Sequence, residues 1–180
     1  MNTIAVREVG LEDIEELQKI GRQTFSETFS DVNTEENMML YLEEGFSKEK
    51  LHEALSSLDS EFYFAELNDE VIGYLKLNFG PSQTELKDER ALEIERIYIL
   101  KEFQGEKAGQ LLFEKVIEIA NKSDVDYIWL GVWEENTRAI SFYKKNGFVP
   151  FDTHTFRLGD DEQTDVMMKL QLKDYESVSQ

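Results

Sequence analysis

The sequence predicts one α/β domain in which a mixed sheet carries helices on its faces. The 180 residues fit a single domain, and a hydrophobic fraction of 41% is enough for one sizeable core. Segments with the alternating pattern of strands are interleaved with segments whose apolar residues recur at helical spacing. No linker-like stretch divides the chain. We therefore expect a domain over residues 1–172 and a polar tail over residues 173–180 that frays.

The first third of the chain predicts a strand and three helices. Residues 3–9 alternate as a strand does, and apolar residues recur at helical spacing over residues 11–29. Asn33 or Thr34 is placed to cap a second helix, and Ser47 is placed to cap a third.

The remaining two thirds predict six strands and two helices. The strands are expected at residues 61–67, 71–79, 91–100, 125–133, 148–158 and 165–172, and the helices at residues 110–121 and 136–145. Hairpin turns are expected at Asn68-Asp69-Glu70 and at Gly159-Asp160-Asp161. The resulting order is typical of a mixed sheet covered by helices.

The acidic composition limits the kinds of partner. The chain has 19 Lys and Arg residues against 38 Asp and Glu residues, a formal net charge of −19. This balance argues against binding to duplex nucleic acid or to an anionic membrane surface, and it fits a cationic partner. The charge is −13 in residues 1–90 and −6 in residues 91–180. The second half is therefore less repulsive to an anionic ligand.

The residue types that the chain lacks, or has in small number, exclude further kinds of functional site. The chain has no cysteine, which removes disulfides, thiol nucleophiles and cysteine-based zinc sites. Its two histidines are far apart in the sequence, so we expect no metal site. No apolar stretch has the length of a targeting segment or a membrane span, and the cytoplasm is the default expectation.

A strand, a glycine-containing turn and a helix follow one another in the middle of the chain. The strand at residues 91–100 leads into Gln104-Gly105-Glu106-Lys107-Ala108-Gly109. Free backbone amides at a helix N-terminus bind phosphate, and Gly105 and Gly109 let the backbone approach a ligand closely. The turn matches neither the Walker A loop nor the dinucleotide fingerprint. Taken alone, it is explained equally well as a glycine turn that serves only chain geometry.

A second segment, residues 136–148, reads Asn-Thr-Arg-Ala-Ile-Ser-Phe-Tyr-Lys-Lys-Asn-Gly-Phe. Asn136 stands at a helix start, and Tyr143 lies two turns further along the same face. Each residue also has a purely structural explanation, Asn136 as a helix cap and Tyr143 as a core aromatic.

Together the two segments resemble the signature motifs of the GNAT superfamily of N-acetyltransferases, Q/R-x-x-G-x-G/A and N-x-x-A-x-x-F-Y-x-x-x-G-F, in order and separation. The resemblance covers nearly the whole chain. It implies a GNAT fold over residues 1–172, with a mixed, mostly antiparallel seven-stranded sheet, helices on both faces and a central splayed strand pair. Lys107 replaces the first glycine of the motif, and we expect its ammonium to pair with a phosphate.

Longer runs at residues 73–78, 92–98, 129–134 and 154–165 are similar to the bacterial PaiA-type branch, which is associated with spermidine/spermine N-acetyltransferase activity. The resemblance implies acetyl-CoA as the cofactor. Its phosphates, pantetheine arm and thioester would be held by Ile97, Tyr98, Ile99, Gln104, Gly105, Glu106, Lys107, Ala108, Gly109, Gln110, Asn136, Tyr143 and Lys145. Tyr143 would also protonate the leaving thiolate.

An acceptor amine has a pKa near that of lysine, ~10.4, and must lose a proton before it attacks. The resemblance places Glu95 at the position of the base, and Glu93 lies two residues away on the same strand face. The residues expected around the acceptor are Glu27, Asp31, Glu93, Trp133 and His154. Each also has a structural alternative, as a solvated acid, a packed aromatic residue or a surface histidine.

The leading hypothesis is an acetyl-CoA-dependent enzyme that acetylates a primary amine of spermidine or spermine by direct attack in a ternary complex. One alternative keeps the enzyme but changes the acceptor to a protein amine or another small amine. A second alternative is a regulator that binds acetyl-CoA without turnover. Glu95, Asn136 and Tyr143 favour an enzyme, and family resemblance leaves a homodimer open.

Overall fold

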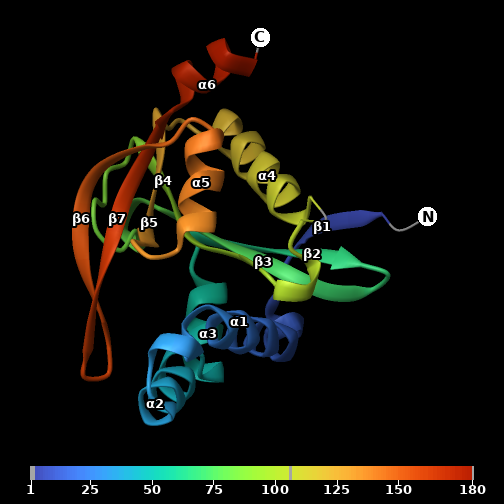
Figure 1. Cartoon of the computed structure of the whole chain (residues 1–180). Helices are drawn as coiled ribbons and strands as arrows, with labels where there is room; N and C mark the ends of the chain where they lie inside the picture. Colours follow the sequence, from blue (N-terminus) through green and yellow to red (C-terminus); the bar gives the residue numbers. More distant parts are fainter. Residues whose placement is uncertain (1–2, 106, 180) are drawn as a thin grey trace.

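The computed structural model describes residues 3–105 and 107–179, and in it the alternating and apolar runs of the sequence form one mixed sheet (Figure 1). Across the described residues the strand order is β1-β2-β3-β4-β5-β7-β6. Every neighbouring pair is antiparallel except β4 and β5, which are parallel. The strands are β1 Ile4–Glu8, β2 Ser60–Leu67, β3 Glu70–Phe79, β4 Ala91–Ile99, β5 Tyr127–Trp133, β6 Val149–Leu158 and β7 Asp161–Gln171. The predicted fold class is confirmed.

Helices cover both faces of this sheet. The first group is α1 Ile14–Phe29, α2 Glu35–Gly45 and α3 Lys48–Ser56, and the second is α4 Ala108–Lys122 and α5 Thr137–Lys145. The predicted caps are confirmed, because the side chains of Thr34, Ser47 and Asn136 each accept a hydrogen bond from the backbone amide three residues later. Between the two candidates for the α2 cap, the structure selects Thr34.

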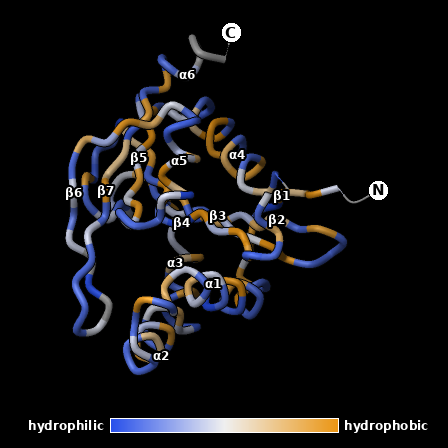
Figure 2. The backbone as a smooth tube through the Cα atoms, viewed as in Figure 1, coloured by the Kyte–Doolittle hydropathy of each residue, from blue (hydrophilic) through white to orange (hydrophobic). Residues whose placement is uncertain are grey.

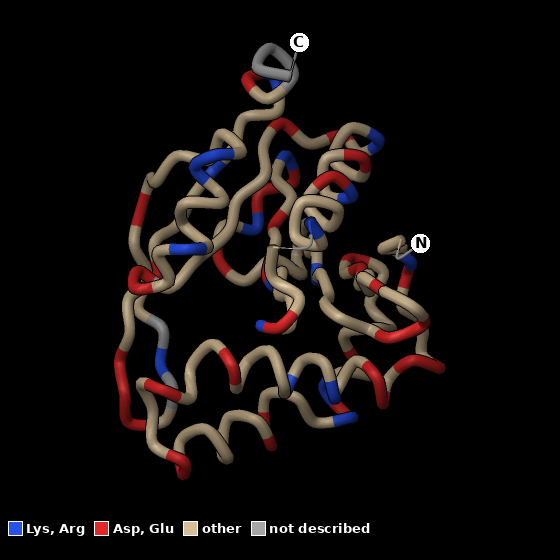
Figure 3. Tube along the Cα trace, turned by 45° about the vertical axis from the view of Figure 1, so that its right-hand side comes forward, with Lys and Arg blue, Asp and Glu red and all other residues tan. Residues whose placement is uncertain are grey.

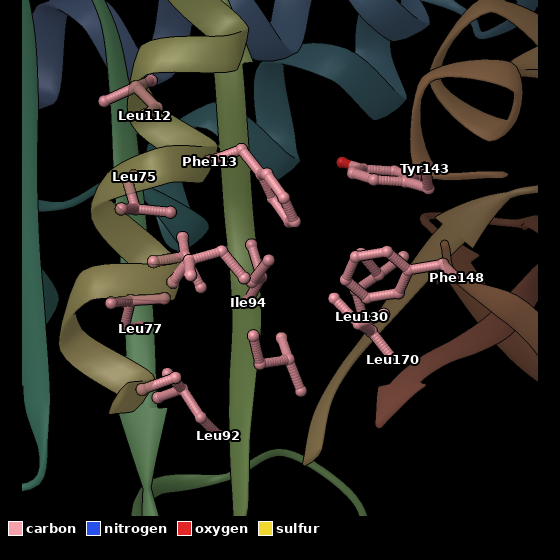
Figure 4. Close-up of a cluster of buried hydrophobic side chains, with 14 of the residues drawn as sticks. Leu75, Leu77, Leu92, Ile94, Leu112, Phe113, Leu130, Tyr143, Phe148 and Leu170 are labelled. Atoms are coloured by element: carbon pink, nitrogen blue, oxygen red, sulfur yellow. The ribbon is translucent and has the colours of Figure 1, made fainter. Parts of the chain in front are cut away.

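The core is divided by the sheet into two layers. On the side of α4 and α5, Leu75, Ile94 and Phe113 belong to one buried cluster (Figure 4). On the side of α1 and α3, Leu17 and Phe64 belong to another. Figure 2 shows hydrophobic residues following the central strands, whereas the outer β6–β7 hairpin is mostly hydrophilic. No helix in the described part of the chain is long and apolar enough to cross a membrane.

Two predicted element boundaries are wrong. The strand expected at residues 165–172 begins earlier, at Asp161, because the hairpin closes tightly and pairs Leu158 with Asp161. The tail that was expected to fray forms α6, Leu172–Ser179. Leu172 is buried and the Tyr175 ring lies 6.0 Å from the Phe113 ring, so this polar segment gains apolar contacts that its composition does not suggest.

The central strand pair is splayed, as expected. The β4–β5 ladder covers only four residue pairs and ends where Ile94 faces Leu130. Beyond that point β4 stays paired with β3 up to Ile99, and β5 stays paired with β7 up to Trp133. The two halves of the sheet therefore diverge, and one edge of residues 95–99 is left without a neighbouring strand.

A β-bulge lies at the start of the divergence. Ile94 pairs with Leu77 and Arg96 pairs with Lys76, so Glu95 has no partner of its own on β3. Such a bulge bends a strand and redirects its side chains, and bulges are frequent next to active sites.

Candidate functional site

The divergence of β4 and β5 opens a cleft of about 1320 Å³. Residues 95–99 of β4 line one side, and residues 131–133 of β5 line the other. We call the part near the start of α4 the α4 end; it includes Gln104, Lys107 and Gly109. We call the part near α1 and β7 the α1 end; it includes Glu93, Glu95 and Asp165.

The α4 end is built from the turn that precedes α4. The helix begins at Ala108, so the amides of residues 108–110 have no carbonyl four residues earlier within the helix. Lys107, which replaces a glycine of the motif, adopts a left-handed backbone with φ +70, and Gly105 has φ +95. A lysine thus takes the conformation that usually selects glycine, at a strain of about 1 kcal/mol. The turn that the motif predicts is retained.

This end of the cleft is suited to a polyanionic ligand. Acidic residues are spread over the molecule (Figure 3), and Glu114 and Glu135 are among the residues that line the cleft. Four cationic side chains line it as well, and they are Lys101, Lys107, Arg138 and Lys145. A Cβ on Gly109 would meet its nearest atoms at 4.0 Å, so a side chain there would fill cleft space without disturbing the core. These observations fit the phosphates of a coenzyme.

Asn136 and Tyr143 line the middle of the cleft. The Asn136 side-chain oxygen caps α5 by accepting from the Ala139 amide at 3.2 Å, which leaves its NH₂ group able to donate to a ligand. Tyr143 is 7% exposed, and its ring packs edge-on against Phe148 with centroids 5.7 Å apart. Its hydroxyl points toward the side of Phe113 and of the strand that carries Ile94 (Figure 4). Burial raises the pKa of this phenol, which therefore stays protonated at neutral pH.

Glu93 is a buried carboxylate at the α1 end. Its Oε1 accepts from Asn78 Nδ2 at 3.0 Å and from the Thr84 amide at 2.8 Å, and its Oε2 accepts from the Thr84 hydroxyl. Burial raises the pKa of this carboxyl, although the hydrogen bonds from Asn78 and Thr84 oppose the rise. Three of about four acceptor positions are used, so one remains for an amine or a water molecule from the cleft.

Glu95 has the opposite electrostatic environment. Its Oε1 lies 2.9 Å from Lys76 Nζ and accepts from Asn78 Nδ2 at 2.8 Å, and its Oε2 lies 3.3 Å from Arg96 Nε. Burial acts to raise the pKa of Glu95, but the charges of Lys76 and Arg96 outweigh burial and lower it to about 2. Glu95 is therefore a permanent negative charge and a weak proton acceptor.

The other expected acceptor residues have mixed positions. Glu27 lines the α1 end, and its carboxylate accepts from the Lys101 amide at 3.0 Å. Trp133 lies 5.3 Å from the Phe29 ring, and His154 Nδ1 lies 3.0 Å from Glu85 Oε1. Asp31 is exposed in the turn after α1 and is not among the cleft-lining residues.

Most of the residues expected to hold the cofactor line the cleft together. Two differ: Ala108 is buried and would contribute only its backbone amide, and Glu106 lies outside the described residues. The residues that line the cleft as expected are Ile97, Tyr98, Ile99, Gln104, Gly105, Lys107, Gly109, Gln110, Asn136, Tyr143 and Lys145.

Sequence reasoning missed four side chains of the α1 end. Glu85, Arg96 and Asp165 line the cleft, and Lys76 contacts Glu95. Three of them lie in the runs that resemble the PaiA-type branch, but no role was expected for any of the four. The Arg96 guanidinium lies 4.5 Å from the Phe46 ring centre, a contact between segments fifty residues apart. No local sequence pattern predicts such contacts between distant segments.

Comparisons with known proteins agree with this geometry. A sequence profile of the acetyltransferase (GNAT) family matches residues 17–148. Over 169 residues the chain is 40% identical to an uncharacterised N-acetyltransferase of Lactobacillus delbrueckii subsp. lactis, covering 94% of this chain and 98% of that protein. Over 155 residues it is 30% identical to the spermidine N(1)-acetyltransferase of Thermoplasma acidophilum, covering 84% and 91%. The crystal structure of PaiA N-acetyltransferase from Thermoplasma acidophilum in complex with coenzyme A superimposes with a TM-score of 0.78 at 28% identity, covering 94% and 99%.

Proposed function

The chain belongs to the acetyltransferase (GNAT) family and is an acetyl-CoA-dependent N-acetyltransferase; on that premise, we propose that its acceptor is a primary amine of a polyamine such as spermidine or spermine. We also propose that it belongs to the PaiA-type branch. The observation that carries the proposal is one continuous cleft that contains Lys107 and the free amides of α4 together with the carboxylates Glu93, Glu95 and Asp165. The relative named as a spermidine acetyltransferase supports the same acceptor class.

The α4 end would hold the coenzyme. The free amides at the start of α4 and the neighbouring Lys107 would hold its phosphates, with Lys145 nearby. The unpaired edge at residues 97–99 would supply backbone hydrogen bonds to its arm, and Asn136 would donate its NH₂ group. Acetyl-CoA supplies the acetyl group as a thioester, and the cleft lets the amine reach it directly from the α1 end.

Two carboxylates would handle the amine. Glu95, held ionised by Lys76 and Arg96, would attract the ammonium form. Glu93 would accept its proton, because its pKa is raised, it lines the cleft and one of its acceptor positions is unused. The assignment of the base to Glu95 stays a prediction, and its lowered pKa makes Glu93 the stronger candidate.

Tyr143 would deliver a proton to the departing sulfur. The thiol of the coenzyme has a pKa near that of cysteine, ~8.5, so a protonated phenol is acidic enough to assist its departure. Burial is the only influence on the pKa of Tyr143 among the described residues, with no hydrogen-bond partner contributing, which leaves the hydroxyl proton for a ligand.

A thiol-release assay with a panel of amines tests the proposal. Purified protein with acetyl-CoA is given spermidine, spermine, putrescine, lysine or a peptide with a free amino terminus. We expect the highest kcat/KM with spermidine or spermine, and salt to raise their KM because carboxylates attract them. Faster turnover of the peptide or of lysine would overturn the polyamine assignment. Absence of thiol release with every amine would overturn this proposal as a whole.

A further inference from the structure

Asp165 occupies a defined place at the α1 end. In the sheet register it lies opposite Trp133 of β5 and opposite His154 of β6. Side chains of directly paired residues project from the same face of a sheet. Because Trp133 packs against Phe29 of α1, Asp165 projects toward the α1–α3 side, as Glu93 does.

The Asp165 carboxylate has no hydrogen bond or ion pair within the described part of the chain, unlike Glu85, Glu93 and Glu95 in the same cleft. Glu93 and Glu95 are held by Asn78 and their further partners, and Glu85 pairs with His154. Burial raises the pKa of Asp165, and only the charge of His154 opposes the rise. A partly buried carboxylate without a partner is unfavourable, so a cationic ligand that reached it would relieve that cost.

The space beside Asp165 is open toward the reacting carboxylates. Its Oδ2 would lie 3.6 Å from a Cβ on Gly131, but Gly131 has no side chain and its position on β5 stays free. β5 is the strand between β7 and β4. Asp165 and Glu95 therefore lie on opposite sides of β5, where β4 and β5 diverge, with no side chain from Gly131 between them.

Aromatic rings form the wall above this space. Trp133, Phe29, Phe25 and Tyr41 all line the cleft, and the rings of Phe25 and Tyr41 are stacked with centroids 4.2 Å apart. Aromatic faces pack well against methylene groups and attract alkylammonium ions. The wall thus fits the hydrocarbon chain between two charged groups.

We propose that Asp165 is a specificity-determining residue that binds the second ammonium of the acceptor, while Glu93 and Glu95 receive the reacting amine. The inference rests on the proposed function and narrows it to linear amines with two cationic groups joined by a flexible chain. A monoamine has no second ammonium for Asp165 to bind, so its kcat/KM should be lower than that of a diamine with the same carbon chain.

Asp165→Asn tests this role with a matched pair of acceptors. Diaminooctane and octylamine have the same carbon chain and differ only in the second amine. At saturating acetyl-CoA we expect Asp165→Asn to lower kcat/KM for spermidine and diaminooctane by about ten- to hundredfold, through KM, the usual effect of losing a charged hydrogen bond. Octylamine kinetics should stay unchanged.

Asp152→Asn is the control, because Asp152 is an exposed acid on β6 outside the cleft and loses the same charge. Asp165→Glu, which keeps the charge, should restore part of the diamine preference even if the asparagine variant folds poorly. An equal loss for diaminooctane and octylamine, or no loss for either, would overturn the role of Asp165. Wild-type enzyme that prefers octylamine would instead overturn the polyamine proposal, and the role of Asp165 would fall with it.

Discussion

Glu95→Gln should remove a contribution to stability that depends on pH. In the native protein the carboxylate is held between Lys76 and Arg96, and its pKa is about 2 against an ordinary value of 4.5. In the unfolded chain it regains the ordinary value. A carboxyl whose pKa is lowered by folding stabilises the protein above the unfolded pKa, and that stabilisation is lost as the pH falls toward the native pKa.

The size of the effect follows from these two values. Each pH unit between the native and unfolded pKa is worth about 1.4 kcal/mol, so Glu95 contributes about 3 kcal/mol to the free energy of unfolding at neutral pH. The side chain is only 19% exposed, so solvent screening reduces this little. By about pH 3.5, roughly 1.4 kcal/mol of the contribution is lost, and the rest disappears near pH 2.

Urea denaturation of the wild type and of Glu95→Gln at pH 7 and at about pH 3.5 measures the effect. The difference in free energy of unfolding between the two proteins should shrink by about 1.4 kcal/mol on acidification. Glu70→Gln, at the exposed start of β3, is the control, and its small difference should hold within about 0.5 kcal/mol. A Glu95→Gln difference that is equally constant would refute the ion-paired state of Glu95.

Three further predictions concern the cleft. Glu93→Gln should abolish the acid limb of the pH dependence of kcat/KM, whereas Glu95→Gln should leave that limb in place. If the acid limb persists in Glu93→Gln, another residue is the base. Tyr143→Phe should lower kcat by ~10²–10⁴-fold with little change in coenzyme A affinity or melting temperature, because the contacts of its ring are kept. The control, Tyr74→Phe, removes another buried hydroxyl and should stay active. Equal losses of kcat in the two variants would contradict the role of Tyr143. Lys107→Gly should raise the free energy of unfolding by up to about 1 kcal/mol, because glycine adopts the left-handed backbone without strain, whereas Lys107→Gln should not. Both variants lose the ammonium and should weaken coenzyme A binding by about two- to fivefold in calorimetry. A glutamine variant as stable as the glycine variant would rule out backbone strain at this position.

The cofactor end of the cleft was largely predictable from sequence. A phosphate-binding turn needs backbone amides at a helix start, and these come from consecutive residues, so Gln104–Gln110 could be found by local pattern and by resemblance. The helix caps were predictable for the same reason, since a cap and its amide are three residues apart. Even Lys107, which breaks the motif, keeps the predicted turn.

The acceptor end was decided by contacts between distant segments. Glu93 and Glu95 are near-equivalent in the sequence, and nothing local says that one pKa is raised and the other lowered. That difference arises because a bulge places Glu95 between Arg96 and Lys76 of the neighbouring strand, while Thr84 from a loop covers Glu93. The unpartnered state of Asp165 likewise depends on β5 lying between β4 and β7 with a glycine at that position.

The sequence by itself determined the fold class, the family resemblance and the turn that would bind phosphate, because each is encoded by spacing within a short segment or by a pattern along the chain. Only the tertiary structure decided which carboxylate is ionised, which is buried with a raised pKa, and which is left for a ligand. Charge interactions depend on distance and burial, and both are set when strands far apart in the sequence become neighbours in the sheet.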